Sequence, residues 1–281
     1  MHQAVIMGKH FAAACARGVC GQVHSVFDRA INIQIAERHT DLSLLTILCA
    51  ESDVMPASLV TSMRGASWHK NGKVGGQVIF SPDKIYLDSV PLIGGIAAAA
   101  VWEPMDAVQL AHLPQLTLKE IMIRCEQVDS QIKQSGICTN DFPVMQLHEF
   151  DVTKLLGLGD GLTPAGDDFL AGMLFAMHFA QKVYRQECSY LPAIAESVLQ
   201  NMVQQTNQIS RHFLRYAAEG LWGRATQRFL LALFGREDHA FHAAVMDKMS
   251  YGATSGMDEM RGILFGLCET IRLFEGGSLC I

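Results

Sequence analysis

The chain has 281 residues, of which 49% are hydrophobic and 18% are charged. This composition predicts a large buried core and argues against disorder. The formal net charge is −6 and no basic run occurs, which argues against nucleic acid as a partner. No apolar stretch of membrane-spanning length is free of charges or helix breakers, and the first twenty residues do not resemble a secretory signal. We therefore expect a globular protein with no membrane partner.

The cysteines predict a reducing compartment. None of them has CxxC spacing, and most lie among apolar neighbours, which is typical of buried free thiols. We expect the protein to be cytoplasmic. The eight cysteines stand at positions 15, 20, 49, 125, 138, 188, 268 and 280.

The first hundred residues predict a β-rich domain that follows one short helix over residues 4–17. Short runs with alternating or continuous apolar residues are separated by Gly, Asn-Gly and Ser-Pro-Asp turn signals. No β–α–β alternation occurs, so a dinucleotide-binding fold is not expected, and the spacing favours an antiparallel sheet or a small barrel. The predicted strands are Ala30–Ala36, Leu42–Ala50, Val74–Phe80, Lys84–Leu87 and Ile96–Trp102.

After a predicted linker at Pro104–Pro114, the pattern becomes helical. Thr117–Gln134 is amphipathic, and Glu120 stands three residues after Thr117, which predicts a capping box at the helix start. We therefore expect an α+β protein, with a β-rich N-terminal domain over residues 1–110 and an α-helical domain over residues 111–281. Further helices are predicted at 164–183, 191–205, 209–220, 222–235, 237–250 and 257–274.

A glycine-rich loop, Gly157–Asp168, leads into the most apolar of these helices. Thr163 is the predicted N-cap and Pro164 the predicted first helical residue. The free N–H groups and the positive dipole end of such a helix form a site for an anion. The alternative is an ordinary capped turn whose glycines only satisfy backbone geometry.

The loop has a second copy at Gly252–Asp258. The two copies share the pattern Gly-x-Thr, a short gap, Gly-x-Asp, three residues and Gly-x-Leu-Phe. Glycine inside a helix costs about 1 kcal/mol relative to alanine, so Gly172 and Gly262 need a reason, and a close helix crossing supplies one. We therefore expect the two helices to cross at these glycines and both loops to face one cavity. The alternative is a duplication kept only for packing.

Asp168 and Asp258, in the two first turns, are the candidate catalytic residues, and each could orient an amine or bind a cation. Between the copies, Thr206 and Ser210 share a helix face near Arg211, and these hydroxyls either contact the ligand or bond to nearby backbone. No motif in the sequence indicates a cofactor, and we predict no metal ligand. The candidate substrate- or anion-binding residues are Gly159, Gly161, Thr163, Gly166, Asp167, Thr206, Ser210, Thr254, Ser255 and Gly256.

The motifs Gly157–Asp168, Thr206-x-x-x-Ser210 and Gly252–Asp258 together resemble a bacterial family long catalogued as a domain of unknown function. Its members include the AllH-type subunit of oxamate carbamoyltransferase. The resemblance implies a transferase reaction in anaerobic allantoin and purine breakdown, in which carbamoyl phosphate and oxamate give oxalurate and phosphate. It also implies an assembly with an FdrA-like subunit and one further subunit.

Other functions remain open at this stage. The chain could be a non-catalytic scaffold or regulatory subunit of such an assembly, or an enzyme that acts on another small acid or amide. Both substrates of the leading hypothesis are small anions, which suits binding at paired helix N-termini.

Overall fold

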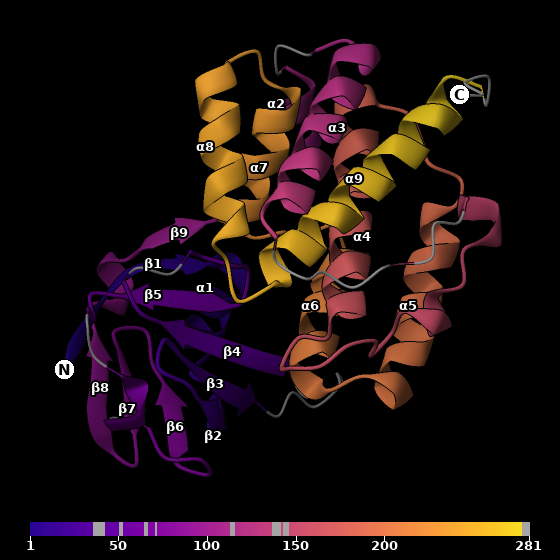
Figure 1. Ribbon diagram of the computed structural model, residues 1–281. Helices are drawn as coiled ribbons and strands as arrows, with labels where there is room; N and C mark the ends of the chain where they lie inside the picture. Colours follow the sequence, from indigo (N-terminus) through magenta and orange to yellow (C-terminus); the bar gives the residue numbers. More distant parts are fainter. Residues whose placement is uncertain are drawn as a thin grey trace. The chain divides into compact units, whose positions relative to one another are not determined.

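The computed structural model describes residues 1–35, 43–50, 53–64, 67–70, 72–112, 116–136, 142 and 146–276. It divides the chain into two compact units, Met1–Pro104 and Met105–Ile281, which we call the barrel unit and the helical unit (Figure 1). No helix within the described ranges is long and apolar enough to cross a membrane.

The barrel unit is one sheet in the order β5-β4-β3-β2-β6-β7-β8-β1-β9, which a further β5–β1 pairing closes. β1 pairs antiparallel with β5 on one side and parallel with β8 and then β9 on the other. The strands are β1 His2–Gly8, β2 Cys20–Val26, β3 Ala30–Ile35, β4 Ser43–Leu48, β5 Ser58–Thr61, β6 Gln77–Phe80, β7 Lys84–Leu87, β8 Val90–Gly94 and β9 Ala100–Trp102. This closure confirms the barrel alternative for the N-terminal part.

The interior of the barrel unit is filled by alternating apolar side chains, as the pleat of a strand requires. Ile31, Ile33 and Ile35 of β3 are all at most 2% exposed. The short helix α1 (Lys9–Arg17) adds Phe11, whose ring contacts Phe80 edge-on at 5.6 Å between centroids. The core of this unit therefore comes from both the strands and α1.

Several boundaries in the barrel unit differ from the prediction. The single helix expected over residues 4–17 is strand β1 followed by α1, because pairing with β5 and β9 makes the first residues extended. The strand expected at Ile96–Trp102 begins as a 3₁₀ turn, Ile96–Ala98, and only Ala100–Trp102 pairs with β1. Residues 36–42, at the predicted ends of two strands, lie outside the described residues.

The helical unit confirms the predicted helices to within a few residues. The Thr117 capping box is present, with the Thr117 N–H donating to Glu120 at 2.7 Å. The predicted linker is wrong in part, because a second capping box, between Asp106 and Gln109, starts a short helix there. The helices are α2 Ala107–Ala111, α3 Leu118–Gln134, α4 Ala165–Tyr184, α5 Leu191–Gln205, α6 Gln208–Ala218, α7 Arg224–Phe234, α8 Asp238–Met249 and α9 Ser255–Phe274.

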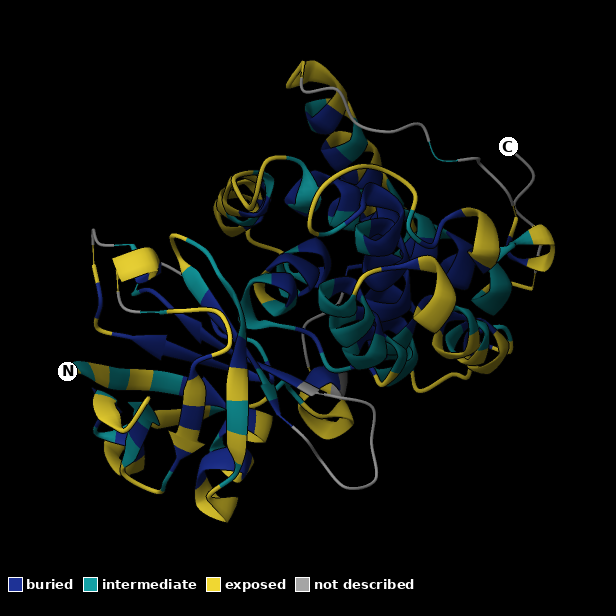
Figure 2. Cartoon of the chain, turned by 90° about the horizontal axis from the view of Figure 1, so that it is seen from below, coloured by how far each residue is buried: buried dark blue, intermediate teal, exposed yellow. Residues whose placement is uncertain are grey.

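Helix α4 is the centre of the helical unit, since fifteen of its twenty residues are buried. In Figure 2 the buried residues of the helices gather in the middle of the group of helices, and exposed residues lie on its outside. It crosses α9, with which it makes its most extensive packing. A methyl group built on Gly172 would lie 2.0 Å from the Glu259 carbonyl oxygen, and one on Gly262 would lie 1.9 Å from that of Phe169. The two backbones are therefore in contact, which confirms the predicted crossing at these glycines. The fold class, α+β with a barrel followed by helices, is confirmed as well.

Replacing Gly172 with alanine is expected to destabilise the protein by about 3 kcal/mol or more, because the added methyl group cannot fit against backbone. Helix propensity alone would change the stability in the opposite direction, by about 1 kcal/mol. Urea denaturation of the purified protein measures the difference.

The matched control is Gly136→Ala, at a site with φ of +67° and no atom near the added methyl group. Backbone strain alone should cost that variant about 1–2 kcal/mol. Equal losses in the two variants would contradict the close crossing.

Candidate functional site

The two loop-to-helix junctions have similar backbone arrangements. The Gly166 N–H donates to the Leu158 carbonyl at 2.8 Å, and the Gly256 N–H donates to the Tyr251 carbonyl at 2.9 Å. At either glycine an added methyl group would lie 2.0 Å from a carbonyl oxygen, that of Leu155 in the first copy and Lys248 in the second. The sequence repeat is therefore a structural repeat, and both glycines are required by backbone contact.

The start of α4 differs from the prediction by one residue. Pro164, not Thr163, is the N-cap residue, and no side chain caps this helix. Thr163 lies just outside, and its hydroxyl is 2.9 Å from the hydroxyl of Ser255 at the start of α9. The two loops thus meet directly, as expected. A cavity between them stays a prediction.

The glycine N–H groups at these junctions are less available than the sequence suggested. Those of Gly166 and Gly256 already bond to carbonyls of their own loops. The N–H groups of Asp167 and Asp168 both donate to the Pro164 carbonyl. Binding of an anion at the helix N-termini therefore has fewer donors to use than two open helix ends would provide.

The Asp168 carboxyl group contacts a hydroxyl group of each loop junction, that of Thr163 and that of Ser255. The residue is half-buried, and its Oδ2 is fully buried with no hydrogen-bond partner among the described residues. Burial raises the pKa of Asp168 to about 8, with the Glu259 charge acting in the same direction, while the Ser255 and Thr163 hydroxyls oppose the rise. Asp168 therefore exchanges its proton near neutral pH.

Asp258, the equivalent residue in the second copy, lies deeper. It is 0% exposed, and both of its carboxyl oxygens are buried. Burial raises its pKa above the ordinary value, whereas the Thr254 hydroxyl and the charge of Arg261 oppose that rise. Asp258 is therefore enclosed, and of the two predicted catalytic acids Asp168 is the more accessible.

A buried ion pair next to Asp168 was not predicted from the sequence. Lys248, whose side chain is 3% exposed, lies 2.7 Å from the Glu259 carboxylate. The Thr226 hydroxyl donates to Glu259 at 2.6 Å and accepts from Lys248 at 3.1 Å. The repeat itself held the signal, since Glu259 stands where the first copy has the apolar Phe169.

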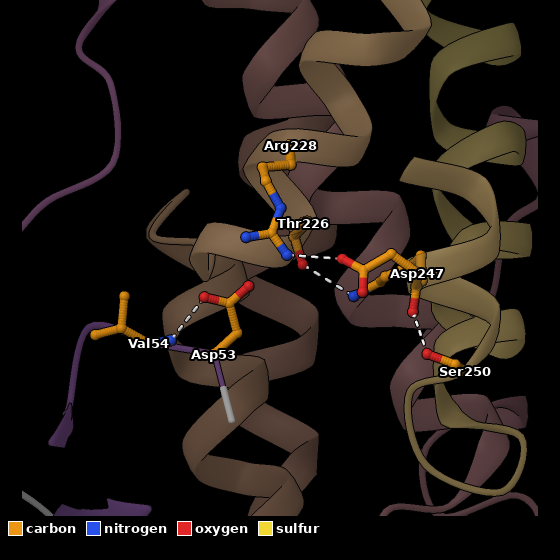
Figure 3. Close-up of polar contacts among 7 residues, drawn as sticks. Asp53, Val54, Thr226, Arg228, Asp247 and Ser250 are labelled. Atoms are coloured by element: carbon orange, nitrogen blue, oxygen red, sulfur yellow. Dashed lines mark hydrogen bonds and ion pairs between the residues drawn. The ribbon is translucent and has the colours of Figure 1, made fainter. Parts of the chain in front are cut away.

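Thr226 belongs to α7, and α7 packs against α8 beside this ion pair. Figure 3 shows Arg228 of α7 reaching Asp247 of α8, at 2.7 Å. Both of these side chains are about half exposed, so this pair contributes little to stability. The buried Lys248–Glu259 pair matters more for stability, because removing one partner would leave the other charge buried without a counter-charge.

Asp167 connects the glycine-rich loop to the junction between α5 and α6. Its carboxylate accepts from the Gly157 N–H at 2.8 Å and from the Thr206 hydroxyl, and the Ser210 hydroxyl lies beside it. Burial raises the pKa of Asp167, and these three donors limit the rise. Asp167, Thr206 and Ser210 are therefore brought together, in a contact that holds the loop in place.

The outer part of the loop is exposed. Gly159 and Gly161 both have φ of +103°, a conformation that favours glycine. Asn207, another residue that sequence reasoning missed, caps α6 and donates to the Leu162 carbonyl at 3.0 Å. An N-cap Asn is recognisable from sequence, but its contact with a loop 45 residues away is not.

Two protein-family models match parts of the chain. Residues 155–267, which contain both loops and the crossing, match the family described as oxamate carbamoyltransferase subunit AllH. Residues 3–98 match the AllH family N-terminal domain. The chain belongs to the AllH family. No solved structure matches the chain.

Membership in the AllH family makes this chain a subunit of a larger assembly, as the family's description states. The match of residues 155–267 begins at Leu155, whose carbonyl contacts Gly166, and ends before the last turns of α9. In the described residues, no group of three or more His, Cys, Asp or Glu side chains is arranged to hold a metal ion.

The raised pKa of Asp168 predicts a specific pH dependence of stability. The ordinary pKa is 3.8 and the folded one about 8, so within this window the folded state holds a proton that unfolding releases. Stability should therefore fall as pH rises from 4 to 8, by at most about 1.4 kcal/mol per pH unit from this group.

The Asp168→Asn variant is expected to flatten this slope, measured by urea denaturation at several pH values. Asp160→Asn, in the exposed part of the same loop, is the control and should keep the wild-type slope. The same slope in Asp168→Asn and in the wild type would show that Asp168 titrates normally.

Replacing Thr206 with valine should destabilise the protein by about 1–3 kcal/mol, because buried Asp167 loses a hydrogen-bond donor. Thr206→Ser keeps the hydroxyl and should cost less than about 1 kcal/mol, from the lost methyl group. Thermal and urea unfolding of the two variants give the comparison. A loss in Thr206→Ser as large as or larger than that in Thr206→Val would mean that the hydroxyl group contributes no more than the methyl group, which would contradict the prediction.

Proposed function

We propose that this chain takes part directly in a carbamoyltransferase reaction that converts carbamoyl phosphate and oxamate to oxalurate and phosphate. The family description supports a role as a subunit of oxamate carbamoyltransferase. The observation that carries the catalytic proposal is the Asp168 carboxyl group, which has an unpartnered buried oxygen and a pKa of about 8 at the meeting point of the two loops.

The reaction needs a base. The amide nitrogen of oxamate attacks the carbonyl carbon of carbamoyl phosphate, the bond from that carbon to the phosphate oxygen breaks, and the nitrogen loses a proton. An amide nitrogen is a weak nucleophile, so removal of this proton must accompany attack, and a base works best when its pKa is near the operating pH. We propose that the Asp168 carboxylate is the base that accepts this proton, since its pKa fits that requirement.

We assign the substrate's phosphate or carboxylate to the outer part of the site. The carboxyl groups of Asp168 and Glu259 would repel an anion close to the crossing, whereas Gly159 and Gly161 are exposed. In this proposal Thr163, Ser255 and Thr254 contact the ligand with their hydroxyl groups. The remaining candidates, Gly166, Asp167, Thr206, Ser210 and Gly256, position the loops through the contacts described above.

The proposal extends to partners and location. We propose that the assembly contains an FdrA-like subunit and one further subunit, and that it acts in the cytoplasm during allantoin breakdown. The described cysteines support a reducing compartment, since Cys15, Cys49, Cys125 and Cys188 are buried free thiols.

A non-catalytic role is the second candidate, and two observations favour it. Asp258 is fully enclosed, and the N–H groups of Gly166 and Gly256 are already bonded within the chain. A subunit of this kind would use the loop pair to hold its own fold, and a partner subunit would carry the active site.

Asp168→Asn should lower kcat for oxalurate formation by about 100-fold or more in the assembly purified with its partner subunits, because the base is lost. The wild-type rate should rise with pH up to about 8 as Asp168 loses its proton, and the variant should lack this rise. Asp160→Asn is the control and should retain the wild-type rate and profile.

Thermal-shift titration of the isolated chain separates the two candidates. A ligand that binds the folded state raises Tm, so carbamoyl phosphate or oxamate should do so if the chain holds the site. Wild-type rates in Asp168→Asn, together with no Tm shift by carbamoyl phosphate, oxamate or phosphate, would establish the scaffold role. If only another small acid or amide raised Tm, that compound would be the substrate in place of oxamate.

A further inference from the structure

Two cysteine thiols from different helices lie in contact. Cys125 of α3 and Cys268 of α9 hydrogen-bond to one another through their sulfur atoms. Cys125 is 4% exposed, and Cys268 is half-buried. This pair could not be predicted from the sequence, because the two residues are 143 positions apart and neither belongs to a CxxC motif.

Both thiols line a cavity of about 420 Å³ between α3, α4 and α9. Its walls are mainly apolar, with Phe169 and Phe265 among them, while Glu126 and Lys133 at its edge are exposed. A small molecule that enters the cavity from solvent would therefore meet both cysteine residues. Cavities of this size accommodate ligands of several hundred daltons.

The two thiols differ in reactivity. The hydrogen bond from Cys125 lowers the pKa of Cys268, and the nearby charge of Arg272 acts in the same direction. The same hydrogen bond and burial raise the pKa of Cys125. Cys268 is therefore the nucleophile of the pair, and Cys125 keeps its proton until a second step, which is the arrangement of a reactive and a resolving cysteine.

We propose that Cys125 and Cys268 form a redox-active dithiol site that reacts with small-molecule disulfides entering the cavity. The Cys268 thiolate attacks one sulfur of the disulfide RSSR, the S–S bond breaks, and RS⁻ leaves. Cys125 then gives its proton to RS⁻ and attacks the Cys268 sulfur, which releases the second RS⁻ and forms the Cys125–Cys268 bond. The second RS⁻ takes up from water the proton that Cys268 released when it became a thiolate. The protein loses two electrons and two protons, and RSSR is reduced to two RSH.

The disulfide would join α3 to α9 covalently. Helix α9 begins with Ser255 and carries Asp258 and Glu259 in its first turns, so the bond would fix the helix that bears half of the candidate site. A cross-link across 143 positions removes much chain entropy from the unfolded state. Oxidation should therefore raise Tm by several degrees.

The test incubates the full-length protein with oxidised glutathione, followed by alkylation of remaining thiols, trypsin digestion and mass spectrometry. The expected product is the peptide of residues 125–133 linked through its cysteine to that of residues 262–272, and dithiothreitol should reverse it. The Cys125→Ser variant should stop at a glutathione adduct on Cys268 and should show no rise in Tm.

Two further variants make the outcome decisive. Cys188→Ser removes a buried thiol elsewhere and should form the linked peptide at the wild-type rate. Cys268→Ser should prevent both the linked peptide and rapid glutathione addition at Cys125. Absence of the linked peptide from the folded wild-type protein, or equal glutathione addition at Cys268 in wild type and Cys125→Ser, would overturn the proposal.

Discussion

The backbone contact between α4 and α9 is the constraint on which the helical unit depends. With a glycine from each helix at the crossing, the Glu259 carbonyl lies against Gly172 and the Phe169 carbonyl against Gly262. Helices usually cross with their axes 8–10 Å apart because side chains separate them. Here no side chain intervenes at the crossing, so the two first turns and the loops before them are held together. The Thr163–Ser255 hydroxyl contact is a direct result.

The same crossing explains why neighbouring acids on one helix have different surroundings. Asp167 receives hydrogen bonds from Gly157 and Thr206, so its burial is compensated. Asp168 points toward the second loop, and one of its oxygens has no partner within the described chain. Burial with few donors favours the protonated form of a carboxyl group. One residue thus holds the loop, and the next has a proton to exchange.

The sequence predicted the features that depend on local pattern or on the repeat. The capping box at Thr117, the positions of the helices and the crossing at Gly172 and Gly262 all follow from spacing along the chain. It did not predict β1, because the first residues become extended only through pairing with β5 and β9, which lie far along the chain. The secondary structure of such a segment depends on its tertiary pairing and not on local propensity.

The candidate site could be predicted only in part, for a related reason. The repeat identified Asp168 and Asp258, but the partners of the glycine N–H groups are carbonyls whose positions depend on how each loop turns back. Lys248 could not be found from the repeat, since it precedes the second copy and has no counterpart in the pattern. Its role becomes clear only where α8 meets α9.

The two copies share a backbone but differ in chemistry, and this difference selects one acid. At equivalent positions the first copy has Phe169, whose ring packs at 5.6 Å from that of Phe265, and the second has Glu259, paired with Lys248. The charge of Glu259 adds to the rise in the pKa of Asp168, whereas Arg261 opposes the rise at Asp258. A duplicated scaffold has thus produced two unequal carboxyl groups. Only the one beside the Thr163–Ser255 contact is accessible, so the divergence of the repeat, as much as its symmetry, marks Asp168.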